Sequence, residues 1–315
     1  MNIRILTGIA AIALLTLGCE PDEFADIDFR LEMIRFVTAI GNYARDSLAA
    51  GEFGIFPQNG EDLGSDQSYR AAVDGIGRED IYYGYDADDE PTPSDVTVEM
   101  ESALDIFRNA ERLVMTIDYA TTQANIDDAY QRSLGRQYVP YVAVRALDRI
   151  CDNMHAPDSS ASHDVVSWTD IGHFVYILQY QSFGNADSFV TALANTYYDL
   201  AIIDYSFDGT DAGQFTVQQV AQMKAKPDGK CRKVIAYLSI GEAEDYRYYW
   251  QSGWCEGNPS FIYEENPNWT GNYKVEYWDP QWQSIIFDYV RKIVEAGFDG
   301  VYLDIIDAFE YFENN

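Results

Sequence analysis

Short apolar runs recur along the chain and alternate with segments in which apolar residues fall three and four positions apart. The first pattern predicts buried strands, and the second predicts amphipathic helices. Runs of the first kind, bounded by Gly, Pro, Asn or Asp, occupy residues 53–57, 74–77, 113–118, 138–144, 174–179, 200–204, 233–239 and 300–303.

Residues 31–48 are predicted to form the first helix, because Leu31, Ile34, Val37 and Ile40 fall on one face. The same spacing predicts helices at residues 69–73, 96–110, 126–134, 186–195, 217–224 and 282–296. Residues 248–277 are rich in aromatic side chains but lack a period, so we expect irregular structure there.

Eight strands that alternate with helices predict a parallel α/β fold, and eight units favour a (β/α)8 TIM-like barrel. A doubly wound open sheet is the alternative. It would usually carry a glycine-rich phosphate turn after its first strand, and Gln-Asn-Gly at 58–60 is not such a turn. Few residues follow the last strand, whereas the helix at 31–48 has no strand before it. We therefore expect this helix to pack where the closing helix of the barrel belongs.

Acidic residues follow several of these strands, and the last strand is the strongest case, with Asp304 and Asp307. A carboxylate at the end of a buried strand costs several kcal/mol unless it is partnered. In barrel enzymes the carboxyl ends of the strands hold the catalytic groups. The alternative is structural, namely that these acids cap the next helix or pair with an arginine.

The amino terminus is predicted to be a bacterial lipoprotein signal peptide, residues 1–18. Arg4 precedes a short apolar run, and Gly18 stands directly before Cys19, the expected site of lipidation. Ordinary secretion with an unmodified Cys19 is the alternative. Residues 19–28 would be an acidic tether and residues 29–315 one domain. This organisation predicts a protein anchored in the bacterial cell envelope, outside the cytoplasm.

The net charge of −31 argues against a nucleic-acid partner, which requires a basic surface, and favours a cationic ligand. Tyr, with 24 residues, outnumbers Phe, with 16, as suits a cleft lined by amphipathic rings. Cys231 and Cys255 could form a disulfide in an oxidising compartment. Residues 153–167 are predicted to be a linker that carries His155 and His163. We favour a solvated loop there over a metal site, and we expect no metal and no cofactor.

Five stretches carry specific motifs. They are Pro-Gln-Asn-Gly at 57–60, Asp-Gly-Ile-Gly-Arg-Glu-Asp at 74–80, Ala-Tyr-Leu-Ser-Ile-Gly-Glu-Ala-Glu-Asp-Tyr-Arg at 236–247, Tyr-Trp-Asp-Pro at 277–280 and Gly-Phe-Asp-Gly-Val-Tyr-Leu-Asp-Ile-Ile-Asp-Ala at 297–308. Together they resemble the endo-α-1,4-polygalactosaminidase-related glycoside hydrolases. Some members of that family are labelled "cysteinyl-tRNA synthetase related", but this chain lacks the basic surface and phosphate-binding signatures of a synthetase.

The resemblance covers roughly residues 30–149 and 172–312, in an order that differs from the family's usual one. Typical members begin with the equivalent of residue 174 and end with the equivalent of residues 31–148. The resemblance therefore implies a circularly permuted (β/α)8 barrel, in which the linker at 153–167 joins the old termini. A barrel tolerates this change because its termini lie close together at the surface.

The resemblance also implies an activity, hydrolysis of α-1,4-linked galactosaminyl polymers, and a catalytic pair, Asp304 and Glu79. One of them would be the nucleophile or base and the other the acid; we assign Asp304 to the first role and Glu79 to the second, with the reverse order as the alternative. Glycoside hydrolysis needs two such carboxyls, with pKa values pushed apart. Other strand-end residues are expected to bind the sugar, namely Gln58, Asn59, Asp118, Tyr119, Asp204, Tyr237, Glu242, Asp245, Arg247 and Asp307.

Two functions follow from these predictions. The first is a monomeric, lipid-anchored hydrolase whose partner is an amino-sugar polysaccharide. The second is a surface protein that binds glycan without cleaving it. The acids at several strand ends favour the enzyme, because a protein that only binds glycan needs no proton donor.

Overall fold

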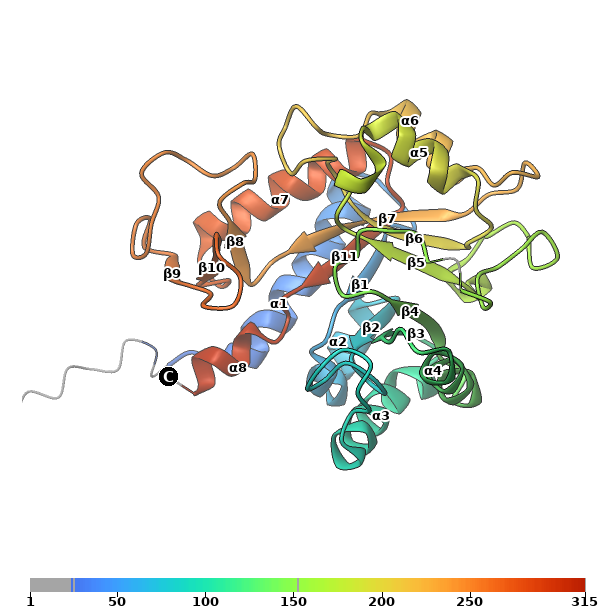
Figure 1. Ribbon diagram of the computed structural model, residues 1–315. Helices are drawn as coiled ribbons and strands as arrows, with labels where there is room; N and C mark the ends of the chain where they lie inside the picture. Colours follow the sequence, from blue (N-terminus) through green and yellow to red (C-terminus); the bar gives the residue numbers. More distant parts are fainter. Residues whose placement is uncertain (1–23, 25, 152, 315) are drawn as a thin grey trace, which may run out of the picture.

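The computed structural model describes residues 24, 26–151 and 153–314 (Figure 1). Helices and strands alternate along most of the chain, as the sequence pattern predicts. The helices are α1 (Phe29–Asn42), α2 (Gln67–Ala72), α3 (Ser94–Asn109), α4 (Gln123–Gly135), α5 (Ala186–Ala194), α6 (Val217–Lys224), α7 (Pro280–Glu295) and α8 (Ala308–Glu313). The strands are β1 (Gly54–Pro57), β2 (Gly75–Glu79), β3 (Leu113–Tyr119), β4 (Val139–Ala143), β5 (Phe174–Ile177), β6 (Leu200–Asp204), β7 (Lys233–Ser239), β8 (Glu242–Glu244), β9 (Ile262–Glu265), β10 (Asn272–Val275) and β11 (Gly300–Asp304).

Eight of these strands form two parallel sheets. One sheet has the order β1-β11-β7-β6-β5, and the other has the order β2-β3-β4. Their residues are almost all buried, as expected for parallel strands that are covered on both faces. The predicted α/β class with parallel strands is therefore confirmed.

The two sheets meet at a seam between β1 and β2. The amide of Asn59 donates to the carbonyl of Gly77 (2.8 Å), and the amide of Asp74 donates to the carbonyl of Ile55 (2.9 Å). The amide of Ile55 bonds the Asp74 carboxylate (2.8 Å) instead of a backbone carbonyl. Pro57, midway between Ile55 and Asn59, has no N–H to offer. The ladder at this seam is therefore interrupted.

The other edges of the two sheets, β4 and β5, also lie side by side. The rings of Tyr141 in β4 and Phe174 in β5 are 5.5 Å apart. Beyond the strand ends, the amides of Leu178 and Gln179 both donate to the carbonyl of Leu147 (3.0 and 3.1 Å). No ladder joins β4 to β5 among the described strands, so closure of the barrel and the circular permutation stay predictions.

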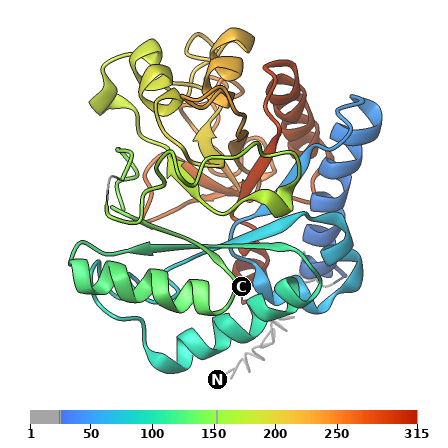
Figure 2. The ribbon, with the colours of Figure 1, turned by 90° about the vertical axis from the view of Figure 1, so that its right-hand side faces the viewer.

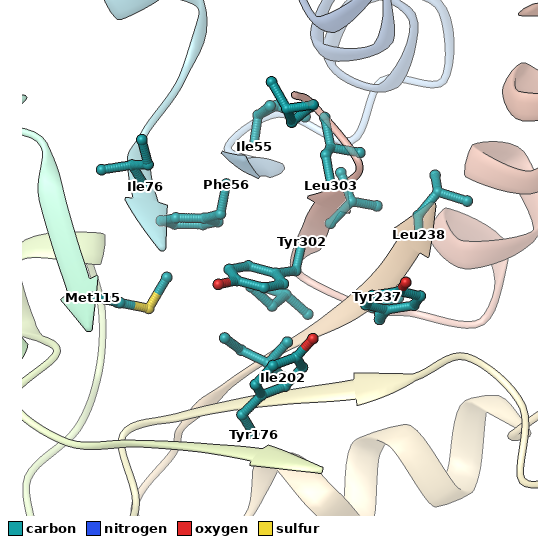
Figure 3. Packing of buried hydrophobic residues seen from close by; sticks show 14 of the residues in the cluster. Ile55, Phe56, Ile76, Met115, Tyr176, Ile202, Tyr237, Leu238, Tyr302 and Leu303 are labelled. Atoms are coloured by element: carbon teal, nitrogen blue, oxygen red, sulfur yellow. The ribbon is translucent and has the colours of Figure 1, made fainter. Parts of the chain in front are cut away.

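Aromatic side chains fill the space between the two sheets. Phe56, Met115, Tyr176, Tyr237 and Tyr302 point into this interior from five different strands (Figure 3). All of them are buried, and the rings of Tyr176 and Tyr302 are 5.4 Å apart. Side chains of the neighbouring residues, such as Ile55 and Leu303, point outward toward the helices, as the two-residue period of a strand requires.

The opening helix α1 lies in the outer layer between α7 and α2 (Figure 2). Phe36 of α1 and Tyr43, just after it, pack against Phe287 of α7 at ring distances of 6.2 and 5.1 Å. On the other side, Arg45 bonds the carbonyl of Phe53 (2.9 Å) and the carboxylate of Asp74. This is the position in which the sequence predicts that the stray helix packs.

The predicted linker at residues 153–167 contains no helix or strand, but its histidines are not free in solvent. His155 stacks on Tyr130 (4.0 Å) and contacts Asp127 (2.7 Å). His163 contacts the carbonyl of Asp170 (2.8 Å). The segment is thus a loop with many exposed residues, in which neighbouring groups hold the two partly exposed histidines. No group of three His, Cys, Asp or Glu residues that could hold a metal ion occurs in the described part of the chain.

The aromatic-rich segment at residues 248–277 is more regular than predicted. It contributes β9 and β10, and β10 pairs antiparallel with both β8 and β9 in a small sheet. Figure 1 shows this sheet beyond the carboxyl ends of β7 and β11. The strands are three or four residues long, too short for a two-residue period to stand out in the sequence.

The predicted signal peptide and Cys19 lie outside the described residues. Of the predicted tether, Phe24 packs on Phe29 (6.0 Å) and Asp28 caps α1 by accepting from the amide of Leu31 (3.0 Å). Cys231 and Cys255 are exposed free thiols, so the disulfide considered from the sequence does not form. No helix in the described ranges is long and apolar enough to cross a membrane.

Candidate active site

Two carboxyls lie at the same edge of the strands. Glu79 is the last residue of β2, and Asp304 is the last residue of β11, so both stand at the carboxyl end of a parallel sheet. The side chains are partly exposed there, although each is surrounded by protein. The structure thus brings together the two residues that the sequence predicts to be catalytic.

The strand ends turn sharply around these acids. Asn59, Asp80 and Ile305 each follow the last residues of a strand, and their φ angles are 58°, 58° and 59°. This left-handed conformation is uncommon for residues other than glycine and is unfavourable for a β-branched residue such as Ile305. Strain of this kind persists only where the surrounding structure holds it, and it is concentrated at functional sites.

Glu79 accepts hydrogen bonds from two side chains. The Tyr119 hydroxyl donates to one oxygen, and the Gln58 amide donates to the other. Burial raises the pKa of Glu79, and the charge of Asp80 adds to this effect, while the two hydrogen bonds and Arg78 oppose it. Glu79 is therefore a carboxyl with a fixed orientation and a raised affinity for a proton.

Asp304 is held in a similar way. The Tyr237 hydroxyl donates to one oxygen (2.6 Å), and the amide of Ile305 donates to the other (2.8 Å). Burial raises the pKa of Asp304 to about 8, and the negative charge of Glu79 contributes to the rise. The two carboxyls are close enough to influence each other, so they titrate as a coupled pair.

A chain of polar side chains extends from Glu79 into the interior of the strands. Gln58 is buried, donates to Glu79 and accepts from the Tyr176 hydroxyl (3.0 Å). Burial raises the pKa values of Tyr176 and Tyr302, and the charges of both Glu79 and Asp304 add to the rise. These two tyrosines therefore lie within the field of both acids. Sequence reasoning missed them, although each is a tyrosine in an otherwise apolar strand.

Gly77 leaves space for the ring of Tyr302. A Cβ atom at residue 77 would lie 1.8 Å from the Tyr302 hydroxyl. The glycine in β2 is therefore required by the ring of β11, and the motif at 74–80 has a packing explanation besides its resemblance.

The rim beside the acid pair carries further charges. Arg78 pairs with Glu61 (2.8 Å) and donates to the Asn59 side chain (2.7 Å). Burial raises the pKa of Asp307, and the positive charge of Arg78 opposes the rise. Asn59 and Asp307, both predicted to bind sugar, are partly exposed next to the pair.

Other predicted sugar-binding residues have structural partners. Tyr119 and Tyr237 are the donors that hold the two acids. Asp118 is buried and accepts from the amides of Tyr82 (2.6 Å) and Tyr83 (2.8 Å), and burial raises the pKa of Asp118 to about 7. This placement suits the support of a loop better than contact with a substrate.

The remaining candidates support the small sheet. Arg247 is buried between Asp204 and Glu244, at 2.6 Å from each, and so ties this sheet to β6. Glu242 is buried and accepts from the Asn266 side chain (2.7 Å), which fixes the turn between β9 and β10. Asp245 is exposed. Direct sugar contact by these residues stays a prediction, and the packing gives each of the buried ones a structural role.

The tryptophans include both buried and exposed side chains. Trp282 is buried and donates to the carbonyl of Ile240 (2.8 Å), whereas Trp269 is 64% exposed at the turn between β9 and β10. A groove of about 520 Å³ runs along the outer side of α7, where Trp254 and Phe261 form part of its wall. None of the residues that line it belongs to the acid pair or its donors.

Comparisons with known proteins support a carbohydrate-active enzyme. Residues 159–315, close to half of the chain, match the model of glycoside-hydrolase family GH114. The matched stretch includes β5, β6, β7 and β11, and therefore Asp304, but not Glu79. The match supports the glycoside-hydrolase family to which the sequence motifs point.

Similar proteins occur in distant microorganisms. An uncharacterized protein of Methanocaldococcus jannaschii is 46% identical over 143 residues, which are 45% of this chain and 38% of the relative. An uncharacterized protein of Thermotoga maritima is 41% identical over 128 residues, which are 41% of this chain and 38% of the relative. One of Deinococcus radiodurans is 39% identical over 132 residues, with shares of 42% and 40%. The chain thus matches about two fifths of the length of each relative.

Proposed function

We propose that this protein is a glycoside hydrolase that cleaves α-1,4-linked galactosaminyl polymers, with Glu79 and Asp304 as its catalytic carboxyls. The observation that carries the proposal is the coupled pair itself. Two acids from different sheets, each held by a tyrosine hydroxyl and an amide, stand at the carboxyl ends of their strands, and the charge of Glu79 raises the proton affinity of Asp304. The match to family GH114 supports the same class of reaction.

In the proposed cleavage of the glycosidic bond, Glu79 and Asp304 share one proton. A glycosidic oxygen needs a proton to leave, and the anomeric carbon needs a nucleophile or an activated water on its other side. A coupled pair that binds one proton supplies both, because one carboxyl is neutral while the other is charged. The tyrosine and amide donors keep both groups oriented, so little reorganisation is needed when charge develops.

The substrate class rests on charge as well as resemblance. The chain carries a net charge of −31, and the rim beside the pair includes Asp307, Glu61 and Asp80. A negative opening attracts a polymer whose amino groups are protonated. We extend the proposal to a monomeric enzyme anchored in the bacterial envelope through Cys19, where such a polymer would be met outside the cytoplasm.

The same proposal includes a permuted barrel. The match to the family begins at residue 159, within the linker, just before β5. Helix α1 lies between α7 and α2, where a barrel that starts at β5 would have the helix after its fourth strand. In this proposal the linker joins the old ends, and the two parallel sheets are parts of one barrel.

The proposal is tested by incubating the purified protein with partly deacetylated galactosaminogalactan and measuring new reducing ends. Wild type should release them, whereas Glu79→Gln and Asp304→Asn should each lose about 10²–10⁴-fold in rate. Asp148→Asn, which removes an acid that pairs with the neighbouring Arg149, is the matched control and should keep full activity. Azide should restore turnover to the variant that lacks the nucleophile or base, which assigns the two roles.

The outcomes separate enzyme from binding protein. If wild type retains the polymer on an affinity gel but releases no reducing ends, the protein binds glycan and the catalytic proposal fails. Activity retained in both carboxyl variants would remove the pair from the mechanism.

A further inference from the structure

The segment that follows Glu79, residues 80–93, is held in place unusually firmly for a loop. The buried Asp118 carboxylate accepts hydrogen bonds from the backbone amides of Tyr82 and Tyr83. Asp89 accepts from the amides of Thr121 (3.0 Å) and Thr122 (2.9 Å) beyond the end of β3. The proposed mechanism uses neither contact, so the fixed position of this loop needs a separate explanation.

A third anchor is Arg145, two residues after the end of β4. One of its terminal nitrogens contacts Asp80 (3.0 Å) and donates to the carbonyl of Gly84 (2.6 Å), and its Nε donates to Asp88. The planar guanidinium makes these contacts at once, which an ammonium group cannot do. Gly84 has a φ of +117°, and a Cβ there would lie 2.2 Å from the Asp80 carboxylate and 2.8 Å from Arg145.

The same guanidinium also covers Tyr119. Its central carbon lies 4.1 Å from the centre of the Tyr119 ring, in a cation–π contact. The hydroxyl of that ring donates to Glu79. Arg145 therefore contacts two residues that act on Glu79. One is Tyr119, whose hydroxyl donates to Glu79, and the other is Asp80, whose negative charge raises the pKa of Glu79.

We propose that Arg145 is a positioning residue for Glu79, which it orients by clamping Asp80 and the 80–88 loop against the ring of Tyr119. This inference deepens the proposed function and rests on it. Arg145 acts on the acid through Tyr119 and Asp80 and reaches no substrate atom. A buried Tyr119 and a neutralised Asp80 then keep Glu79 at a fixed position and a fixed proton affinity.

The charged and titratable groups that face Glu79 come from every neighbouring strand. They are Arg78 and Asp80 beside it in the chain, Tyr119 of β3, Tyr176 of β5, and Tyr302 and Asp304 of β11. Among them, Asp80 and Tyr119 both contact Arg145, which itself does not touch Glu79. Burial raises the pKa of Asp80, and Arg145 is the main group that opposes the rise.

The experiment compares Arg145→Gln, Arg145→Lys and the matched control Arg149→Gln in the full-length protein. Arg149 is exposed and pairs with Asp148, so its loss should change nothing near Glu79. The apparent pKa of Glu79 is followed by NMR of ¹³C-labelled glutamate, with Glu79→Gln to assign the signal. Amide hydrogen exchange of residues 80–89 reports on the clamp.

In Arg145→Gln we expect the apparent pKa of Glu79 to rise by about half a unit or more, because Asp80 is left unneutralised. Exchange of the 80–89 amides should accelerate about tenfold or more. Arg145→Lys keeps the positive charge but loses the planar array of guanidinium donors. The pKa of Glu79 should therefore stay near that of wild type, while exchange of the 80–89 amides still accelerates. On the polymer, kcat of Arg145→Gln should fall about tenfold or more, with a change in KM of less than about threefold.

The proposal is overturned if Arg145→Gln matches Arg149→Gln in both the pKa of Glu79 and the exchange of the loop. Circular dichroism identifies a variant that fails to fold, and Arg145→Lys then provides the decisive exchange measurement. The NMR and exchange results do not depend on activity. A wild type without hydrolytic activity would therefore refute the proposed function and leave the positioning role to be judged by itself.

Discussion

Asp199 at the amino ends of the parallel strands and the acid pair at their carboxyl ends are held in opposite ways. At the amino ends, Asp199 is completely buried and forms an ion pair with the equally buried Lys226 at 2.7 Å. Burial would raise the pKa of Asp199, but hydrogen bonds from His173 and Lys226 and the amide of Gly172 lower it overall. At the carboxyl ends, Glu79 and Asp304 form no ion pair with any of the described residues, and burial raises the pKa values of both.

This difference indicates that the paired acid contributes to stability, whereas the two unpaired acids are suited to proton transfer. A fully paired acid such as Asp199 stays ionised and holds the chain together, because Lys226 also donates to the carbonyl of His163 in the linker (2.8 Å). Two unpaired acids at one opening can exchange a proton near neutral pH, at a cost in folding free energy. Such a division is usual for barrels, whose catalytic groups lie at the carboxyl face and whose stabilising contacts lie at the other.

The largest expected effect on stability lies at the amino ends. Lys226→Met leaves a buried Asp199 without its cation, which should lower the free energy of unfolding by about 3–5 kcal/mol. Urea denaturation measures this. Lys224→Met, which breaks the more exposed pair with Asp299 (2.9 Å), should cost about 1 kcal/mol or less. Equal losses in the two variants would contradict the assigned role of burial.

A smaller effect should follow the loss of Trp168. This ring lies against Gly54 at the start of β1, its centre is 4.9 Å from that of Phe56, and Lys233 lies over its face at 5.3 Å. Trp168→Ala should reduce the free energy of unfolding by about 2 kcal/mol, since the ring is only partly buried. The rate of polymer cleavage at a permissive temperature should stay unchanged, and a fall in kcat would show that the two ends are coupled.

The smallest effect should have the opposite sign. Asp304 holds its proton up to about pH 8 in the folded protein and releases it near its ordinary value of 3.8 when unfolded. The folded state binds more protons in this window, so wild type loses stability as the pH rises from about 4 to 8. Asp304→Asn should therefore be more stable than wild type by about 1–2 kcal/mol at pH 8, with partial exposure limiting the gain.

The check is a pair of thermal denaturation curves. The difference in Tm between Asp304→Asn and wild type should shrink steadily as the pH falls from 8 to 4, because the unfolded carboxyl binds its proton only near its ordinary pKa of 3.8. A constant difference across this range, or a less stable variant at pH 8, would mean that Asp304 is not held as described.

Much of the fold follows from the sequence, because apolar runs and helical spacing are local signals. Residues 200–204, 217–224 and 233–239 have the predicted bounds, and the final strand differs by one residue, Asp304 itself. The catalytic candidates could be named because they follow such runs and lie in motifs. Glu79 proved to be the last residue of its strand, where the sequence suggested a position beyond it.

The rest depends on contacts between distant residues. Gln58 and Tyr119 were predicted to touch the sugar, but they hold Glu79 across 21 and 40 positions of sequence. Tyr176 is 118 positions from Gln58 and carries no local sign of their contact. Arg145 has no local signal in the sequence, since its partners Asp80 and Gly84 become neighbours through the turn that Gly84 permits.

The seam between β1 and β2 bears directly on the acid pair. Glu79 belongs to the smaller sheet and Asp304 to the larger one, so the gap between their carboxyls spans this interrupted ladder. Pro57 withholds one bond there, and the Gln58 side chain reaches across to Glu79 instead. The spacing of the pair is thus set by the few bonds that cross this interrupted ladder, those of Asn59 with Gly77, of Asp74 with Ile55 and of the Gln58 amide with Glu79.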